Sequence, residues 1–128
     1  MHYSRARYWT FKNFKPKEVS CPCCGQFVPD YEAYDALQRA RDLAKVPFKI
    51  NSGHRCRIHN ARVGGAAKSM HKWIAFDISV VGRNRQAILK ACKDAGFTGF
   101  GYYQTFLHVD LGRPRYWYGK GARVLWNG

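Results

Sequence analysis

The chain has 128 residues, of which 46% are hydrophobic and 16% aromatic. It is therefore long enough for one folded domain with a real core and too apolar for a disordered tail. Lysine and arginine number 22 against 8 acidic residues, a formal net charge of +14, which attracts polyanions such as nucleic acid, anionic lipid and anionic polymers of the cell envelope. We expect a single domain over residues 1–128.

The first predicted element is a helix over residues 31–44. Its apolar residues recur on one face, and Asp30 just before it has the side chain of an N-cap. Residues 46–51 are rich in β-formers and predict a strand, which should end in a turn at residues 52–53.

The second half of the chain predicts a short helix, a strand, a longer helix that ends at Gly96, and a closing pair of strands. These elements cover residues 57–63, 74–81, 83–95, 100–103 and 106–111. A helix followed by strands with an inserted helix is typical of the α+β class. We expect a small antiparallel sheet packed against helices.

No apolar run reaches the roughly 20 residues of a membrane span, and no apolar export segment follows the N-terminus. We therefore expect the protein to be synthesised in the cytoplasm without a signal peptide. The sequence implies no stable protein partner, and we expect a monomer.

Five cysteines leave three interpretations open. Without a secretion signal, a disulfide framework is not the default. Cys21, Cys23 and Cys24 could hold a structural zinc, but this would need a second cluster, and only Cys56 and Cys92 remain. Buried small thiols, with or without one bridge from the cluster to Cys56, are the favoured alternative.

Two carboxylates stand out because they lie in predicted strands among apolar neighbours. These are Asp77 and Asp110, and an unpaired polar group buried there costs roughly 2–7 kcal/mol, a charge more. Asp77 and His108 on neighbouring strands, with His71 from the preceding loop, would form a catalytic zinc set that leaves a fourth position for water. The alternative is that these are ordinary buried polar residues paired with some of the many lysines and arginines.

Four motifs follow one another along the second half of the chain. They are SGHRCRIHN (52–60), VGGA (63–66), SMH with AFDI (69–71, 75–78), and GFGYY with LHVD (99–103, 107–110). Together they resemble the zinc peptidases that cut peptidoglycan stem peptides. That family includes D-alanyl-D-alanine carboxypeptidases and the L-alanyl-D-glutamate endopeptidases used as phage endolysins, and it shares its fold with the hedgehog signalling domain. Residues 14–24 also resemble the start of phage members.

The resemblance implies a hedgehog/DD-peptidase-like fold, a single zinc peptidase domain over residues 1–128, and a Zn²⁺ cofactor on His71, Asp77 and His108. It assigns Arg55 to a substrate carboxylate or to the oxyanion formed on attack at the amide. A guanidinium suits either role because it is a fixed fork of donors. The implied substrate is the peptidoglycan stem peptide.

Two features depart from the family pattern. Family members usually carry six residues, commonly with a glycine, between the metal histidine and aspartate, whereas only five separate His71 from Asp77 and none is glycine. If the missing residue is in the loop before Ile74, the strand alternation is unchanged and Asp77 still points to the metal-binding face. We expect the loss to be in this loop. Many relatives carry an acid where this chain has Thr105. We therefore expect Asp110 to be the general base, the alternative being that it orients a metal-ligating imidazole.

The resulting expectation is a zinc-dependent peptidoglycan peptidase, either a carboxypeptidase or an endopeptidase, of the phage endolysin kind or a related cell-wall lytic enzyme. It would reach the wall after release, for example through a holin lesion, and its basic surface would hold it near anionic envelope polymers. One alternative is a catalytically impaired cell-wall-binding module of the same fold. Another is a nucleic-acid-binding domain that uses the aromatic and basic residues 113–118 for stacking.

Overall fold

The computed structural model describes residues 1–127; the last residue of the expected domain 1–128, Gly128, lies outside them. Five strands form one sheet in the order β1-β2-β4-β3-β5. They are β1 (Ile50–Ser52), β2 (Phe76–Ser79), β3 (Gly99–Tyr102), β4 (Phe106–Asp110) and β5 (Arg115–Tyr118). All neighbouring strands are antiparallel except β5, which runs parallel to β3.

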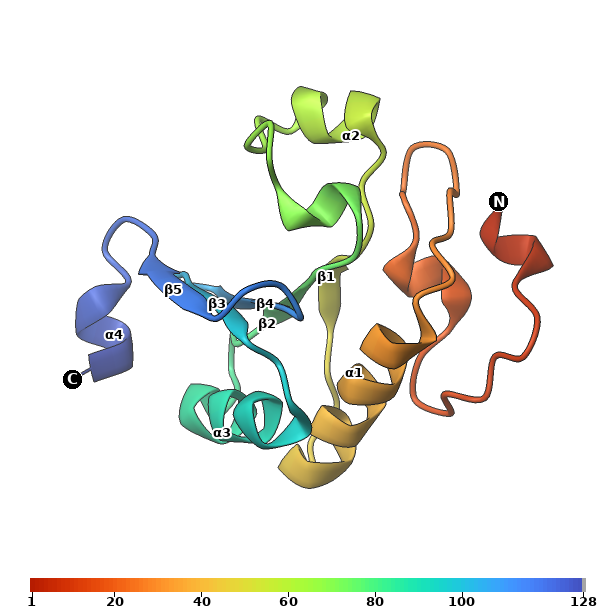
Figure 1. The fold of residues 1–128 in the computed structure, drawn as a ribbon. Helices are drawn as coiled ribbons and strands as arrows, with labels where there is room; N and C mark the ends of the chain where they lie inside the picture. The colour runs from red at the N-terminus through yellow and green to blue at the C-terminus, as the bar shows by residue number, and fades with distance from the viewer. Residues whose placement is uncertain (128) are drawn as a thin grey trace.

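Helices lie on both sides of this sheet (Figure 1). They are α1 (Tyr31–Ala44), α2 (Arg57–Arg62), α3 (Arg85–Ala95) and α4 (Arg123–Asn127), with short 3-10 helices η1 (Tyr3–Arg5), η2 (Pro16–Val19) and η3 (Met70–Lys72). α1 and α3 pack against each other on one side, while α2 lies on the other. Within residues 1–127, the helices are all too short or too polar to cross a membrane. The expected α+β class is confirmed.

Alternation along the strands separates an apolar face from a polar one. The apolar face packs against α1 and α3 and contributes buried side chains from the three central strands. These are Phe76, Ile78, Phe100, Tyr102, Leu107 and Val109. The residues between them point the other way because successive strand side chains alternate. Asp77, His108 and Asp110 therefore share the face that looks toward α2 and η3.

The predicted helix boundaries follow capping residues. The helix over residues 31–44 is confirmed, and the Asp30 side chain accepts a hydrogen bond from the Ala33 backbone N–H at 3.2 Å. The helix predicted over residues 83–95 begins at Arg85 instead, because the Asn84 side chain caps its first turn.

The strands differ more from prediction. The expected strand 74–81 is shortened to β2, which ends at Ser79 because its partner β4 begins opposite it, at Phe106. The expected strand 46–51 is reduced to β1 and shifted toward the turn; Pro47, which lacks a backbone donor, precedes it. Neither β5 nor α4 was expected from the sequence. The parallel β3–β5 pairing also means that the sheet is mostly, not wholly, antiparallel.

Candidate metal centre

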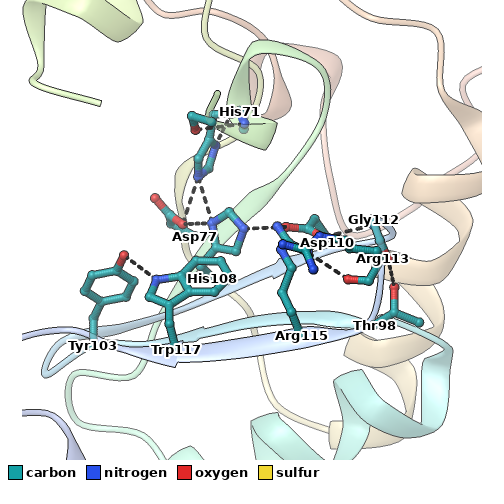
Figure 2. Close-up of polar contacts among 12 residues, drawn as sticks. His71, Asp77, Thr98, Tyr103, His108, Asp110, Gly112, Arg113, Arg115 and Trp117 are labelled. Atoms are coloured by element: carbon teal, nitrogen blue, oxygen red, sulfur yellow. Dashed lines mark hydrogen bonds and ion pairs between the residues drawn. The ribbon is translucent and has the colours of Figure 1, made fainter. Parts of the chain in front are cut away.

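Three side chains bring one ligand atom each to a common point on the polar face of the sheet (Figure 2). His71 Nε2 lies 3.0 Å from Asp77 Oδ1. His108 Nδ1 lies 3.2 Å from both of these atoms. Ligands about 2.0–2.1 Å from a tetrahedral zinc ion are roughly 3.3 Å apart. The triangle therefore matches one face of a zinc coordination tetrahedron.

Strand register and a short loop build this triangle. Asp77 on β2 pairs directly with His108 on β4, so the two side chains lie side by side on one face. His71 comes from η3, where the Ser69 hydroxyl accepts its backbone N–H at 3.1 Å. The backbone turns between η3 and β2, and Asp77 then points to the same side as His108. Asp77 thus lies on the same sheet face as His108, the phase that we expect for a loss in the loop before Ile74.

Outer hydrogen bonds decide which imidazole nitrogens carry protons. His71 Nδ1 lies 2.7 Å from the Gly53 carbonyl oxygen, which can only accept, so Nδ1 donates and Nε2 presents a lone pair. His108 Nε2 lies 2.7 Å from Asp110 Oδ2 and donates to it, so Nδ1 presents a lone pair. Two lone pairs and a carboxylate oxygen directed at one point suit a cation, and this donor set suits zinc.

The electrostatics of the triangle agree with a cation site. Burial alone would raise the pKa of Asp77, but hydrogen bonds and charge from His108 and His71 outweigh it and lower that pKa to about 2. Burial would likewise lower the pKa of His108, yet its bonds to Asp110 and Asp77 raise it. Asp77 is therefore an anion throughout the neutral range, and its charge is balanced either by a proton on a neighbouring imidazole or, when both imidazoles are neutral and present lone pairs, by a bound cation.

Asp110 lies behind His108 and away from the ligand triangle (Figure 2). Its buried carboxylate accepts four hydrogen bonds: from His108 at 2.7 Å, from the Gly112 N–H at 2.9 Å, and from Arg115 Nη1 and Nη2 at 2.8 Å each. Burial works against ionisation, but these donors hold its pKa well below the usual range. With its lone pairs occupied, Asp110 is not placed to take a proton from substrate or water. This geometry argues against the general-base role expected from the sequence.

A cleft of about 480 Å³ opens beside the triangle. Arg55, Lys68, Tyr103 and Trp117 line it, and Asp77 is its single carboxylate residue among those that the structure describes. Arg55 lies where the resemblance implies a substrate-binding residue.

The guanidinium of Arg55 is only partly used within the protein. Its Nη2 donates to the Ser69 hydroxyl at 3.3 Å. Its buried Nε has no hydrogen-bond partner among residues 1–127. A buried donor without a partner costs roughly 1–3 kcal/mol. The unused capacity of Arg55 therefore favours an acceptor supplied by a ligand in the cleft.

Three further residues at this centre, Arg115, Trp117 and Tyr103, were not expected there from the sequence. Arg115 bonds Asp110, and its guanidinium carbon lies 5.2 Å from the Trp117 ring centre. The Trp117 ring lies 5.0 Å from that of His108, and its Nε1–H donates to the Tyr103 hydroxyl at 2.8 Å. The two-residue spacing of Arg115 and Trp117 could have placed them on one strand face. Nothing in the sequence around β5 indicates that this strand pairs with β3.

Glycines on β3 make room for these side chains. Gly101 pairs with His108 on one side and Trp117 on the other. A Cβ built on Gly101 would overlap the Trp117 ring, and one built on Gly99 would overlap Arg115 and Asp110. Gly99 and Gly101 therefore leave room for two β5 side chains to lie across β3. Arg115 reaches Asp110 there, and the Trp117 ring packs near His108.

The family model described as Peptidase M15 matches residues 12–110. This span includes His71, Asp77 and His108. No curated protein matches the chain.

Proposed function

The chain belongs to the peptidase M15 family, a zinc-dependent family, and from this premise we propose that it hydrolyses an amide bond in the stem peptide of peptidoglycan. It acts as a carboxypeptidase or an endopeptidase, of the phage endolysin kind or a related cell-wall lytic enzyme. The observation that carries the proposal is the buried triangle of His71, Asp77 and His108, with both histidine tautomers set to present lone pairs.

The three ligands are the residues that would hold the zinc ion. Zinc in such a set acts as a Lewis acid on a carbonyl oxygen and makes water acidic enough to be a nucleophile near neutral pH. The protein fixes the ligands: the Gly53 carbonyl orients His71, and the Asp110 carboxylate orients His108. We assign Asp110 this positioning role, because its four hydrogen bonds leave it no capacity as a base.

Arg55 and Lys68 give the cleft wall positive charge. A stem peptide carries carboxylates, and the tetrahedral state of amide hydrolysis carries an oxyanion, so both match this wall. Arg55 lines the cleft and makes one side-chain hydrogen bond within residues 1–127, so its guanidinium has donors left to bind one of them.

Tyr103 offers a second group for the substrate. Its hydroxyl accepts a hydrogen bond from Trp117 Nε1–H, which leaves its own hydrogen free to donate. Because Tyr103 lines the cleft, that hydrogen is available to a substrate oxygen or nitrogen.

The basic surface supports a polyanionic cell envelope as the setting in which the enzyme works. A net charge of +14 on 128 residues would concentrate the protein on anionic wall polymers once it is released from the cytoplasm, for example through a holin lesion. The nucleic-acid-binding alternative is less well supported. Arg115 and Trp117, two of the residues 113–118 on which it depends, contact Asp110 and His108 instead.

Mass spectrometry of fragments released from purified peptidoglycan tests the proposal. We expect new termini within the stem peptide, which disappear after chelation and return when zinc is added. A carboxypeptidase releases a single terminal amino acid, whereas an endopeptidase releases a longer peptide or divides the stem. A zinc-loaded protein that binds the wall and releases nothing would overturn the proposed activity and favour the impaired-module alternative.

A further inference from the structure

A second group of metal-binding side chains lies outside the cleft. The sulfur atoms of Cys21, Cys23, Cys24 and Cys56 all lie within 4.8 Å of one another. Cys23 Sγ is 3.5 Å from Cys21 Sγ and 3.4 Å from Cys56 Sγ. All five cysteines fall within the described residues, and each is a free thiol.

This arrangement matches a shared ion better than paired disulfides. A disulfide joins sulfurs two by two at about 2.05 Å, whereas Cys23 Sγ has two sulfur neighbours at nearly equal distance. Four thiolates about 2.3 Å from a tetrahedral zinc ion lie roughly 3.8 Å apart. The two Cys23 distances lie slightly below that value, and no pair of the four sulfur atoms is more than 4.8 Å apart.

The backbone around the cluster is shaped to bring the sulfurs together. The Gly25 N–H donates to the Cys21 carbonyl at 2.7 Å, and the Cys21 N–H donates to the Gln26 carbonyl at 3.0 Å, which closes a tight turn. Gly25 has φ +75°, in the left-handed region that glycine adopts without strain. Cys21 and Cys24 are thus separated by the C-x₂-C spacing common at zinc sites.

A backbone N–H group also points at one sulfur atom of the cluster. Cys56 Sγ accepts the backbone N–H of His59 at 3.4 Å. Such N–H donors compensate the negative charge on sulfur.

We propose that Cys21, Cys23, Cys24 and Cys56 form a second, structural zinc site with four thiolate ligands. The expectation that such a site needs a second cysteine cluster does not apply here, because the turn supplies three ligands and only Cys56 must come from elsewhere. Four sulfur ligands leave no open position, so this site holds structure and performs no chemistry.

The site would fix one wall of the catalytic cleft. Cys56 is the N-cap of α2 and directly follows Arg55. The adjoining loop is already tied to the N-terminal segment, since the His54 N–H donates to the Val19 carbonyl at 2.9 Å. An ion shared by residues 21–24 and Cys56 would close the intervening chain into a loop and hold Arg55 and Gly53 in place. The inference rests on the thiols alone and does not require the proposed peptidase activity.

Cobalt spectroscopy of the whole, reduced protein tests this site separately from the cleft. Co²⁺ bound to thiolates gives intense sulfur-to-metal absorption in the near ultraviolet, which a set of two histidines and an aspartate cannot produce. We expect this band in the wild-type protein and its displacement by Zn²⁺. Cys24→Ser and Cys56→Ser should weaken or remove the band, while Cys92→Ser, a change of the buried cysteine on α3, should retain it.

Zinc content gives a second measurement that needs no cysteine variant. We expect about two zinc ions per chain in the wild type, and one, with sulfur ligands in X-ray absorption, in His71→Ala/His108→Ala. A wild-type protein without the sulfur band, whose cysteines are either all freely alkylated or joined in disulfides by mass, would overturn the proposal. Loss of peptidoglycan cleavage with the sulfur band intact would count against the proposed function and leave this site standing.

Discussion

The carboxylate of Asp110 lies directly behind the imidazole of His108, with 2.7 Å between Oδ2 and Nε2. Arg115 holds that carboxylate through two further bonds of 2.8 Å. The chain of contacts therefore runs from Arg115 through Asp110 to His108, and it aims Nδ1 of His108 at Asp77. A carboxylate in this position tunes a metal ligand.

Replacing Asp110 by Asn tests that role. The amide keeps the shape but loses the charge that fixes His108, and one of its ends meets the Arg115 donors unfavourably. We expect zinc affinity to fall about 10–100-fold, with activity restored by excess zinc, in binding titrations and assays at several zinc concentrations. Asp94→Asn, at an exposed pair with Lys90, is the matched control. Normal zinc affinity with a rate reduced by roughly 10²–10⁴ would instead identify Asp110 as the base.

Removal of any ligand of the triangle should remove zinc from the cleft and activity together. His71→Ala, Asp77→Ala and His108→Ala each leave two ligands, too few for a stable site. Metal analysis and peptidoglycan hydrolysis measure the two losses, and His59→Ala on α2 is the control. If Asp77→Ala kept its cleft zinc and its activity, the five-residue spacing would have displaced Asp77 and the proposed ligand set would be wrong.

Arg55→Gln should impair catalysis without affecting zinc. Loss of a charged hydrogen bond to the substrate costs about 1.5–3 kcal/mol, or roughly 10- to 150-fold in kcat/KM. The exposed Arg57, two residues along, provides the control Arg57→Gln, which should change kcat/KM little. Equal effects of the two variants would show that Arg55 acts through general surface charge and not through a contact in the cleft.

Gly101→Ala should destabilise the fold near the metal centre, because the added Cβ overlaps the Trp117 ring. Overpacking of this kind costs about 1–3 kcal/mol, measurable by denaturant unfolding. Trp117→Ala removes the obstacle, so the cost of Gly101→Ala should shrink in that background. Additive costs in the double variant would show that the two residues do not compete for the same space.

Salt should weaken the attraction of the protein to the cell wall more than it slows the hydrolysis reaction itself. If the +14 charge concentrates the enzyme on anionic envelopes, raising salt from low to physiological levels weakens attack on whole envelopes far more than hydrolysis of a short soluble peptide. Parallel rate measurements on the two substrates check this. Equal sensitivity would place the important charge within the cleft.

The strand pattern by itself determined much of this protein. Apolar alternation and capping residues predicted the α1 helix with its Asp30 cap and the three central strands β2, β3 and β4, because these signals act between near neighbours in the chain. The same alternation put His108 and Asp110 on one face. The order of the motifs, together with the resemblance they carry, named His71, Asp77 and His108 as candidate ligands.

The tertiary structure decided what each polar group can do. Asp110 and His108 share a strand face, but only the packing of β5 beside β3 brings in Arg115, which donates to both oxygens of the Asp110 carboxylate. Likewise, no spacing rule joins Cys56 to residues 21–24. Parallel pairing and loop contacts link residues that are distant in sequence, and their energies depend on burial and donor geometry that a linear pattern does not contain.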